Sequence, residues 1–232
     1  MEFKTIIYAL ASGILPALLW LWFWLKEDNL HPEPRSFIGI TFLGGGLIVI
    51  IAMIIEKIVA GMDFDNTTLY ILLATIEESI KFLLILVIVF NSKYVDEPID
   101  IIIYSITVAL GFAAIENTLF ILSPLNDGDI AKGIITGNMR FIGATLVHIV
   151  SSASIGFMIG ISFYKNIFIK IISTIIGVML AITLHTAFNL SIINVTGTDT
   201  LKIFSWVWFA IVVLLILFEE IKTIRPKVQK IY

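Results

Sequence analysis

Residues 99–122 read IDIIIYSITVALGFAAIENTLFIL, and this stretch decides the fold class. The run is long, continuous and mostly apolar. An α-helix rises 1.5 Å per residue, so about 20 such residues cross the roughly 30 Å hydrocarbon core of a bilayer. Strands of a transmembrane barrel would instead alternate apolar and polar residues over short segments. The stretch therefore predicts a membrane-spanning helix.

The composition of the whole chain supports the same class. Of the 232 residues, 59% are hydrophobic and 14% charged, and the mean hydropathy is +1.02. These values exclude a soluble globular enzyme and a disordered chain. The net charge of −3 argues against a nucleic-acid partner, which requires a basic face. The absence of cysteine excludes disulfides, thiolate metal sites and a cysteine nucleophile.

The apolar runs predict an all-α, polytopic transmembrane helix bundle that forms a single membrane domain over residues 1–232. We expect about seven spans, at residues 3–25, 37–55, 68–90, 99–122, 139–164, 167–193 and 203–221. The connections, such as 26–35 and 124–132, are short and polar. The sequence leaves the oligomeric state open, and the lipid bilayer is the one partner that composition implies.

The basic residues predict the orientation of the bundle. One set of span ends carries nine of them: Lys26, Arg35, Lys93, Lys165, Lys170, Lys222, Arg225, Lys227 and Lys230. The other set carries five: Lys4, Lys57, Lys132, Arg140 and Lys202. The positive-inside rule places the first set in the cytoplasm. We therefore expect a multi-pass cell-membrane protein with its N-terminus outside and its C-terminus cytoplasmic.

Charged residues inside the third span are the strongest functional signal. Glu77 and Glu78 lie four and three residues before Lys81, spacings that allow ion pairs on one helix face. Charges at the bilayer centre cost about 2.5–3.5 kcal/mol each and usually face the bundle interior. One lysine cannot neutralise two carboxylates, so the second is protonated, paired elsewhere or kept as a base. A pair that only fixes helix packing is the alternative.

Further polar residues lie at a similar depth in three other spans. Counted along each helix from its outer end, Glu77, Glu116, His148 and His185 are about 9–13 Å deep. Asn189 follows His185 by four residues and shares its helix face. Unrelated polar residues would scatter in depth, so we expect these side chains to meet. Each could instead simply bond a neighbouring helix.

Other polar residues have simpler interpretations. Glu56, near a span end, is expected to snorkel or cap. Ser152, Gly156 and Gly160 form a small-residue face for helix packing. Arg140, at the outer start of the fifth span, either snorkels or holds substrate.

The order of these motifs resembles the PrsW family of intramembrane proteases. The similarity rests on the double glutamate with its lysine, a Gly-Phe-Ala-x-x-Glu-Asn motif, a histidine span and a His-x-x-x-Asn motif. These residues are Glu77, Glu78, Lys81, Gly111, Phe112, Ala113, Glu116, Asn117, His148, His185 and Asn189. The resemblance to the family extends to Glu33-Pro34, Asp100 and Tyr104. The lysine stands one residue earlier than the arginine of the distantly similar CAAX-processing family, so prenyl-protein processing is the less favoured branch.

The resemblance implies an endopeptidase that hydrolyses a membrane-embedded protein or peptide near the extracytoplasmic side. The implied substrate is of the anti-sigma-factor regulatory type, and the implied location is a prokaryotic plasma membrane. Glu77 and His148 would activate water, and His185 and Asn189 would hold the oxyanion. Glu78 or Glu116 would position the base and supply a proton, while Lys81 balances charge.

A metal-dependent version of the same chemistry is also open. His148, His185 and either Glu77 or Glu116 could bind Zn²⁺ and leave a fourth position for water. The sequence slightly favours the version without a metal, because it lacks a His-Glu-x-x-His motif.

Two functions from other classes use the same residues. Intramembrane Glu and His chains also relay protons in ion-coupled transporters, although the spans show no repeat of the kind usual there. A noncatalytic membrane scaffold or lipid binder is the third interpretation.

Overall fold

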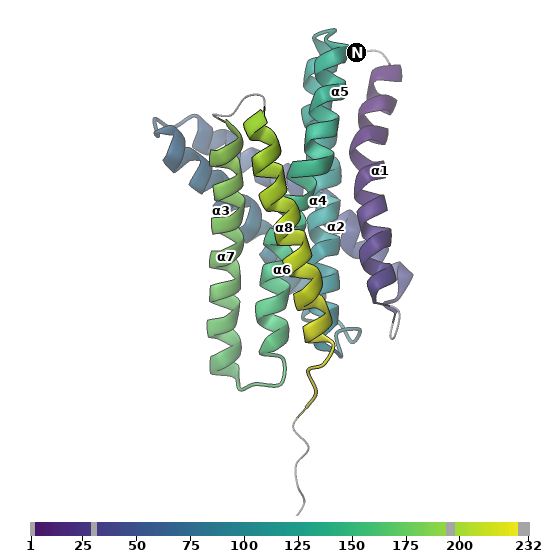
Figure 1. Cartoon of the computed structure of the whole chain (residues 1–232), viewed down its shortest axis with the longest axis vertical. Coiled ribbons are helices and arrows are strands. Elements are labelled where there is room, and N and C mark those ends of the chain that lie inside the picture. The colour runs from purple at the N-terminus through teal and green to yellow at the C-terminus, as the bar shows by residue number, and fades with distance from the viewer. Residues whose placement is uncertain (1–2, 29–31, 194–197, 227–232) are drawn as a thin grey trace, which may run out of the picture.

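The structure is a computed structural model that describes residues 3–28, 32–193 and 198–226, and within them it is all-α (Figure 1). The helices are α1 Phe3–Glu27, α2 Arg35–Ala60, α3 Asn66–Leu84, α4 Pro98–Asn126, α5 Ile130–Met139, α6 Thr145–Ile161, α7 Ile167–Ile193 and α8 Thr198–Ile221. Two π-helical turns extend them: η1 Ile85–Val89 continues α3, and η2 Arg140–Ala144 joins α5 to α6. The α4–α5 turn lies at the top of Figure 1 and the α6–α7 turn at the bottom.

Each of the seven predicted spans is a helix, but one of the seven is not apolar enough to count as a candidate membrane span. Six helices of the described residues are long and apolar enough to cross a bilayer: α1, α2, α4, the continuous α5–η2–α6 helix, α7 and α8. The exception is α3, whose 19 residues include Glu77, Glu78 and Lys81. The orientation of the bundle across the membrane stays a prediction.

The connection predicted at 124–132 is present but shorter, because only residues 127–129 lie between the helices. Helix α4 continues through Pro124 to Asn126, and the fifth span begins at Ile130 rather than near 139. Gly128 adopts a φ of 81°, which glycine tolerates without strain, so the chain reverses within three residues. Asp129 then caps the next helix by accepting a hydrogen bond from the backbone N–H of Lys132 at 2.9 Å.

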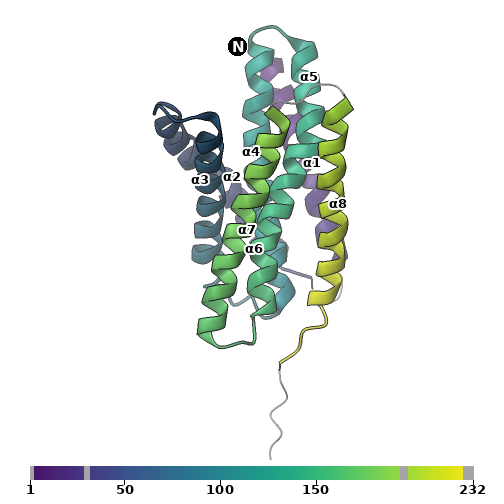
Figure 2. The same cartoon turned by 60° about the vertical axis from the view of Figure 1, so that its left-hand side comes forward.

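Helix α4 is the centre of the bundle. It is buried along most of its length and packs against α1, α2 and α6 (Figure 2). Glycines allow the close approach: a Cβ on Gly111 would lie 2.0 Å from the carbonyl oxygen of Phe42, and one on Gly45 would lie 2.2 Å from that of Val108. The predicted small-residue face is confirmed in part, because a Cβ on Gly156 would lie 2.7 Å from Cα of Ile102.

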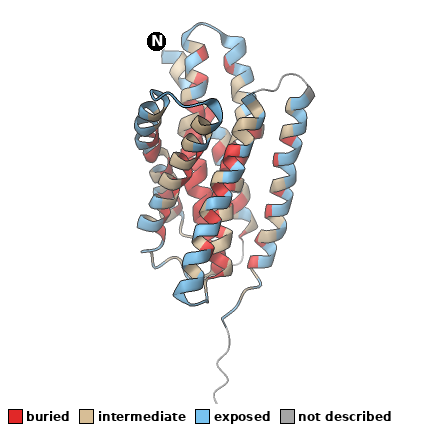
Figure 3. Cartoon of the chain, turned by 90° about the vertical axis from the view of Figure 1, so that its left-hand side faces the viewer, coloured by how far each residue is buried: buried red, intermediate tan, exposed pale blue. Residues whose placement is uncertain are grey.

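The outer faces of the bundle are exposed and apolar. Figure 3 shows buried residues in the interior and exposed residues on the outward helix faces. On α2 these exposed residues include Leu43, Leu47 and Ile50. A water-soluble bundle would place polar residues there, so this surface fits contact with lipid.

Helix α3 begins at a well-formed cap. The Asp65 side chain accepts hydrogen bonds from the Thr68 backbone N–H at 3.1 Å and from the Thr68 hydroxyl at 2.6 Å. These bonds hold the pKa of Asp65 below its usual value. The cap fixes where the helix starts.

Candidate active site

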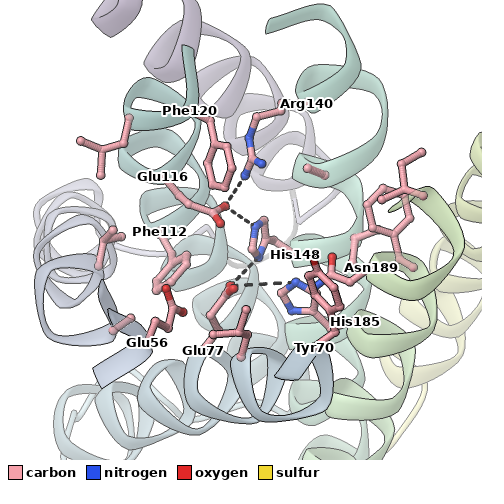
Figure 4. Close-up of a pocket in the computed structure, with 18 of the residues that line it drawn as sticks. Glu56, Tyr70, Glu77, Phe112, Glu116, Phe120, Arg140, His148, His185 and Asn189 are labelled. Carbon is pink, nitrogen blue, oxygen red and sulfur yellow. Dashed lines mark hydrogen bonds and ion pairs between the residues drawn. The ribbon is translucent and has the colours of Figure 1, made fainter. Parts of the chain in front are cut away.

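A cavity of about 640 Å³ opens among α2, α3, α4, α6 and α7 (Figure 4). Residues from all these helices line it, and most of the lining is apolar, with Phe112 and Phe120 among it. Its polar lining includes Glu77, His148, His185 and Asn189. The prediction that Glu77, Glu116, His148 and His185 meet is confirmed, because these residues of α3, α4, α6 and α7 line one cavity. The depth counted for His148 is wrong, because its helix begins at Ile130 and places it 18 residues from that end.

Glu77 Oε2 occupies the centre of the polar group. It lies 3.8 Å from Nδ1 of His148 and 4.0 Å from Nε2 of His185. This oxygen is buried and has no hydrogen-bond partner among the described residues. A buried carboxylate oxygen without a partner is costly, which indicates that something binds here.

Glu78 orients His185 from the side of the ring that faces away from Glu77. Its Oε1 lies 2.8 Å from Nδ1 of His185 and accepts a hydrogen bond from Nζ of Lys81, also at 2.8 Å. Its Oε2 accepts a bond from the Ser152 hydroxyl at 3.2 Å. An Nδ1–H that donates to Glu78 leaves Nε2 of a neutral His185 with its lone pair toward Glu77. The predicted ion pairs of Lys81 are confirmed, and its Nζ lies 3.6 Å from Glu77 Oε2.

Glu116 orients His148 in the same manner. Its Oε2 lies 2.8 Å from Nε2 of His148 and also pairs with the guanidinium of Arg140. The guanidinium bonds Asn117 as well, whose amide donates to the Thr145 hydroxyl at 2.9 Å. Arg140 begins the π-helical turn η2, a local change that often marks functional sites. Nε2–H of a neutral His148 then donates to Glu116 and leaves Nδ1 toward Glu77 and Lys81.

The geometry fits a divalent transition metal. Donor atoms of Glu77, His148 and His185 all lie within 4.8 Å of one another, and all three residues are buried. In a tetrahedral zinc site the ligand atoms are about 3.3–3.5 Å apart, so the spacings of 3.8 and 4.0 Å need only a small contraction. Each histidine also has a carboxylate on its other nitrogen, the usual support of a metal-binding imidazole. Nζ of Lys81 lies 2.8 Å from Nδ1 of His148. It therefore competes with a metal ion for the lone pair of this nitrogen.

Asn189 lines the same cavity one helical turn after His185 (Figure 4). Its side chain forms no hydrogen bond with another described residue, which leaves the amide available to a ligand. The structure thus brings together the residues that the sequence singled out: Glu77, Glu78, Lys81, Glu116, Asn117, Arg140, His148, His185 and Asn189.

Comparison with known proteins agrees with this arrangement. The profile of the family described as "PrsW family intramembrane metalloprotease" matches residues 33–216, most of the chain and all of the residues that form the cluster. The chain belongs to the PrsW family.

Several curated proteins called "Protease PrsW" are similar to this PrsW-family chain. The protein from Geobacillus kaustophilus is 30% identical over 154 residues, 65% of each chain. The protein from Shouchella clausii is 24% identical over 182 residues, 77% of this chain and 80% of that one. The match thus spans just under two thirds of the first relative. No solved structure matches the chain.

Some residues of the family resemblance lie outside the cluster. Tyr104 donates a hydrogen bond to Glu33, and Asp100 Oδ2 accepts bonds from the backbone N–H groups of Asp96 and Glu97. Asp100 precedes Glu116 by about 24 Å along α4, at 1.5 Å per residue. Burial raises the pKa of Glu33. These contacts tie the α1–α2 connection to the start of α4.

The sequence analysis gave no site role to three residues that line the cavity or bond to its polar cluster. Glu56 was expected to snorkel or cap, but it lines the cavity. Ser152 was assigned to helix packing alone, but its hydroxyl also reaches Glu78. Thr145 bonds Asn117 and carried no sequence signal. Only Glu56 could have been found from the sequence, as a further carboxylate inside an apolar run.

Proposed function

We propose that this chain is an intramembrane endopeptidase that hydrolyses a peptide bond of a membrane-embedded protein. The observation that carries the proposal is the position of Glu77 Oε2, buried and without a hydrogen-bond partner, between a nitrogen of His148 and a nitrogen of His185. A cavity of about 640 Å³ leads to this oxygen and is large enough for an unwound peptide segment. Membership of the PrsW family supports the same activity.

Glu77, His148 and His185 would hold a metal such as Zn²⁺. When bound there, the metal would act as a Lewis acid toward the scissile carbonyl and make a water more acidic. Without a metal, Glu77 takes the proton of the attacking water, with His148 beside it. The donor set and its carboxylate supports favour the metal version over the metal-free version that the sequence slightly preferred.

The surrounding residues position these groups and the substrate. Glu78 and Lys81 fix the ring of His185, and Glu116 with Arg140 fixes the ring of His148. Asn189 has a free amide on the cavity wall, which suits it to donate to the oxyanion. Neutral His185 lacks a free N–H in the arrangement described above, so in the metal version the oxyanion donor is Asn189.

Cleavage near the extracytoplasmic boundary is part of the proposal. It combines the orientation from the basic residues with the depth of the cluster. The substrate helix has to unwind at this point, because helical carbonyls are held in backbone hydrogen bonds. A regulatory membrane protein with one span, such as an anti-sigma factor, is a suitable class of substrate.

The test combines a cleavage assay with metal analysis of the purified protein. We expect wild type to cleave a tagged single-span substrate and to contain about one equivalent of metal, and Glu77→Gln to lose at least ~100-fold in rate. Glu220→Gln, an exposed glutamate on α8, is the matched control. Near-normal cleavage by Glu77→Gln would contradict the assignment, and proton flux in proteoliposomes without cleavage would indicate a transporter.

A further inference from the structure

Glu56 is a cavity-lining carboxylate for which the reaction above has no use. It lies near the end of α2, and Figure 4 shows its side chain beside Phe112 and close to Glu77. Its Oε1 atom is buried and has no hydrogen-bond partner among the described residues. Within the part of the chain that the structure describes, Glu56 also forms no ion pair.

The other two acidic residues on the cavity wall each lie within 4 Å of a cation, although Glu77 shares its cation with Glu78. Glu116 pairs with Arg140, and Glu77 lies 3.6 Å from Nζ of Lys81. Lys57 also lines the cavity, but consecutive residues of a helix point in different directions and do not face each other. Glu56 is therefore the acidic group of this wall without a positive partner. Such a group in an apolar, membrane-embedded wall is costly until a cation joins it.

We propose that Glu56 selects substrates by binding a lysine or arginine side chain close to the scissile bond. The proposal rests on the protease function proposed above. It assigns Glu56 to substrate selection and leaves the bond-breaking chemistry to the Glu77 cluster.

The shape of the cavity favours a basic side chain over other cations. The long apolar stem of lysine or arginine can pack on a lining that includes Met53 and Phe112, while its charged head reaches Glu56. A metal ion is a poorer occupant, because the group of donor atoms close enough for one contains Glu77, His148 and His185 but not Glu56.

The position of Glu56 predicts where the basic residue lies in the substrate. Glu56 precedes the end of α2 at Ala60 by four residues, or about 6 Å of helix rise, whereas Glu77 follows the start of α3 by eleven residues, or about 16 Å. Glu56 is therefore nearer than Glu77 to the α2–α3 turn. The substrate's lysine or arginine should lie on the side of the scissile bond that faces this end, where a basic residue in a membrane is least costly.

The first experiment measures cleavage by the full chain in proteoliposomes. The substrates are single-span proteins that carry Lys, Gln or Glu at each of the four residues on either side of the mapped cleavage site. We expect wild type to prefer Lys over Gln about tenfold or more in kcat/KM at one position. Glu56→Gln should lose this preference, and Glu56→Lys should prefer Glu. Glu220→Gln should behave as wild type.

Three results of that experiment would overturn the proposal. The first is a wild-type enzyme without charge preference at any position. The second is a preference that survives in Glu56→Gln. The third is an equal loss of cleavage of every substrate by Glu56→Gln, which would make Glu56 part of the chemistry instead.

A binding measurement separates this proposal from the protease function. The probe is a fluorescent single-span peptide with the Lys or the Gln substrate sequence, added to Glu77→Gln protein in detergent micelles. We expect the Lys peptide to bind about tenfold more tightly, and Glu56→Gln in the same background to remove the difference. Charge-dependent binding without cleavage in wild type would refute only the protease function, and equal binding of both peptides would refute the role of Glu56.

Discussion

Nδ1 of His185 lies 2.8 Å from Oε1 of Glu78, although the two residues are 107 positions apart in the sequence. The same oxygen accepts a hydrogen bond from Lys81, so one carboxylate connects α7 to the cation of α3. Glu78 is fully buried and lies behind the imidazole rather than on the cavity wall. Its role is therefore to orient His185, whose other nitrogen faces Glu77.

Glu78→Gln tests this positioning role. The amide keeps the shape of the side chain but loses the charge that fixes the ring, and such changes typically cost 10–100-fold in metal affinity or activity. We expect a folded protein with about that loss in cleavage rate and a lower metal content. Cleavage kinetics and metal analysis, with Glu220→Gln alongside, measure both. Unchanged values for Glu78→Gln would mean that His185 needs no support.

The two histidines should be equally necessary. His148→Ala and His185→Ala each remove one of the nitrogens that face Glu77. We expect each variant to lose at least ~100-fold in cleavage rate and to lose bound metal, while the protein stays inserted in the membrane. Mass spectrometry of the purified variants gives the metal content. A variant that keeps its metal but not its activity would place that histidine outside the ligand set.

Removal of Lys81 should destabilise the bundle. Its Nζ is fully buried and lies near both Glu77 and Glu78. Lys81→Met leaves these carboxylates without their cation, which costs about 3–5 kcal/mol for a buried pair. Thermal unfolding in detergent should show the loss. The double variant Lys81→Met with Glu78→Gln should lose less than the sum of the two single variants, and strict additivity would show that the pair is not coupled.

Close packing of α2 on α4 can be tested with two glycines. Gly111→Ala places a Cβ 2.0 Å from the carbonyl oxygen of Phe42, so the helices have to separate. We expect a loss of about 1–3 kcal/mol in the free energy of unfolding, together with reduced cleavage. Gly39→Ala is the matched control, because a Cβ there meets nothing within 4 Å. It should be neutral or slightly stabilising. Equal effects of the two substitutions would contradict the packing argument.

The orientation of the bundle has a direct test, because the chain contains no cysteine. Single cysteines replace Asn66, in the first turn of α3, and Lys165, which is exposed between α6 and α7. We expect a membrane-impermeant thiol reagent to label Asn66→Cys in intact bacterial cells and Lys165→Cys only after the membrane is opened. The reverse pattern would invert the topology and move the expected cleavage site to the cytoplasmic side.

The sequence alone determined the helix content and most of the site. Apolar runs of about 20 residues have few alternatives to spanning helices, because a bilayer leaves no water to satisfy backbone hydrogen bonds. Charged and polar residues inside such runs are costly, so Glu77, Glu78, Lys81, Glu116, His148 and His185 stood out from an otherwise apolar chain. Their positions within the spans also led to the prediction that they meet, although the ends of the spans that carry Glu116 and His148 were misplaced.

Only the tertiary structure decided which atoms face one another. Depth along a helix does not give its rotation or its neighbours. These follow from helix packing, as at Gly45 and Gly111 between α2 and α4, and at Gly156 between α6 and α4. That packing put Glu77 rather than Glu116 between the two histidines, and it turned Glu56 into the cavity. The pairing of His185 with Glu78 and of His148 with Glu116 has the same origin. Such contacts join distant segments through side-chain geometry, and no local pattern in the sequence encodes them.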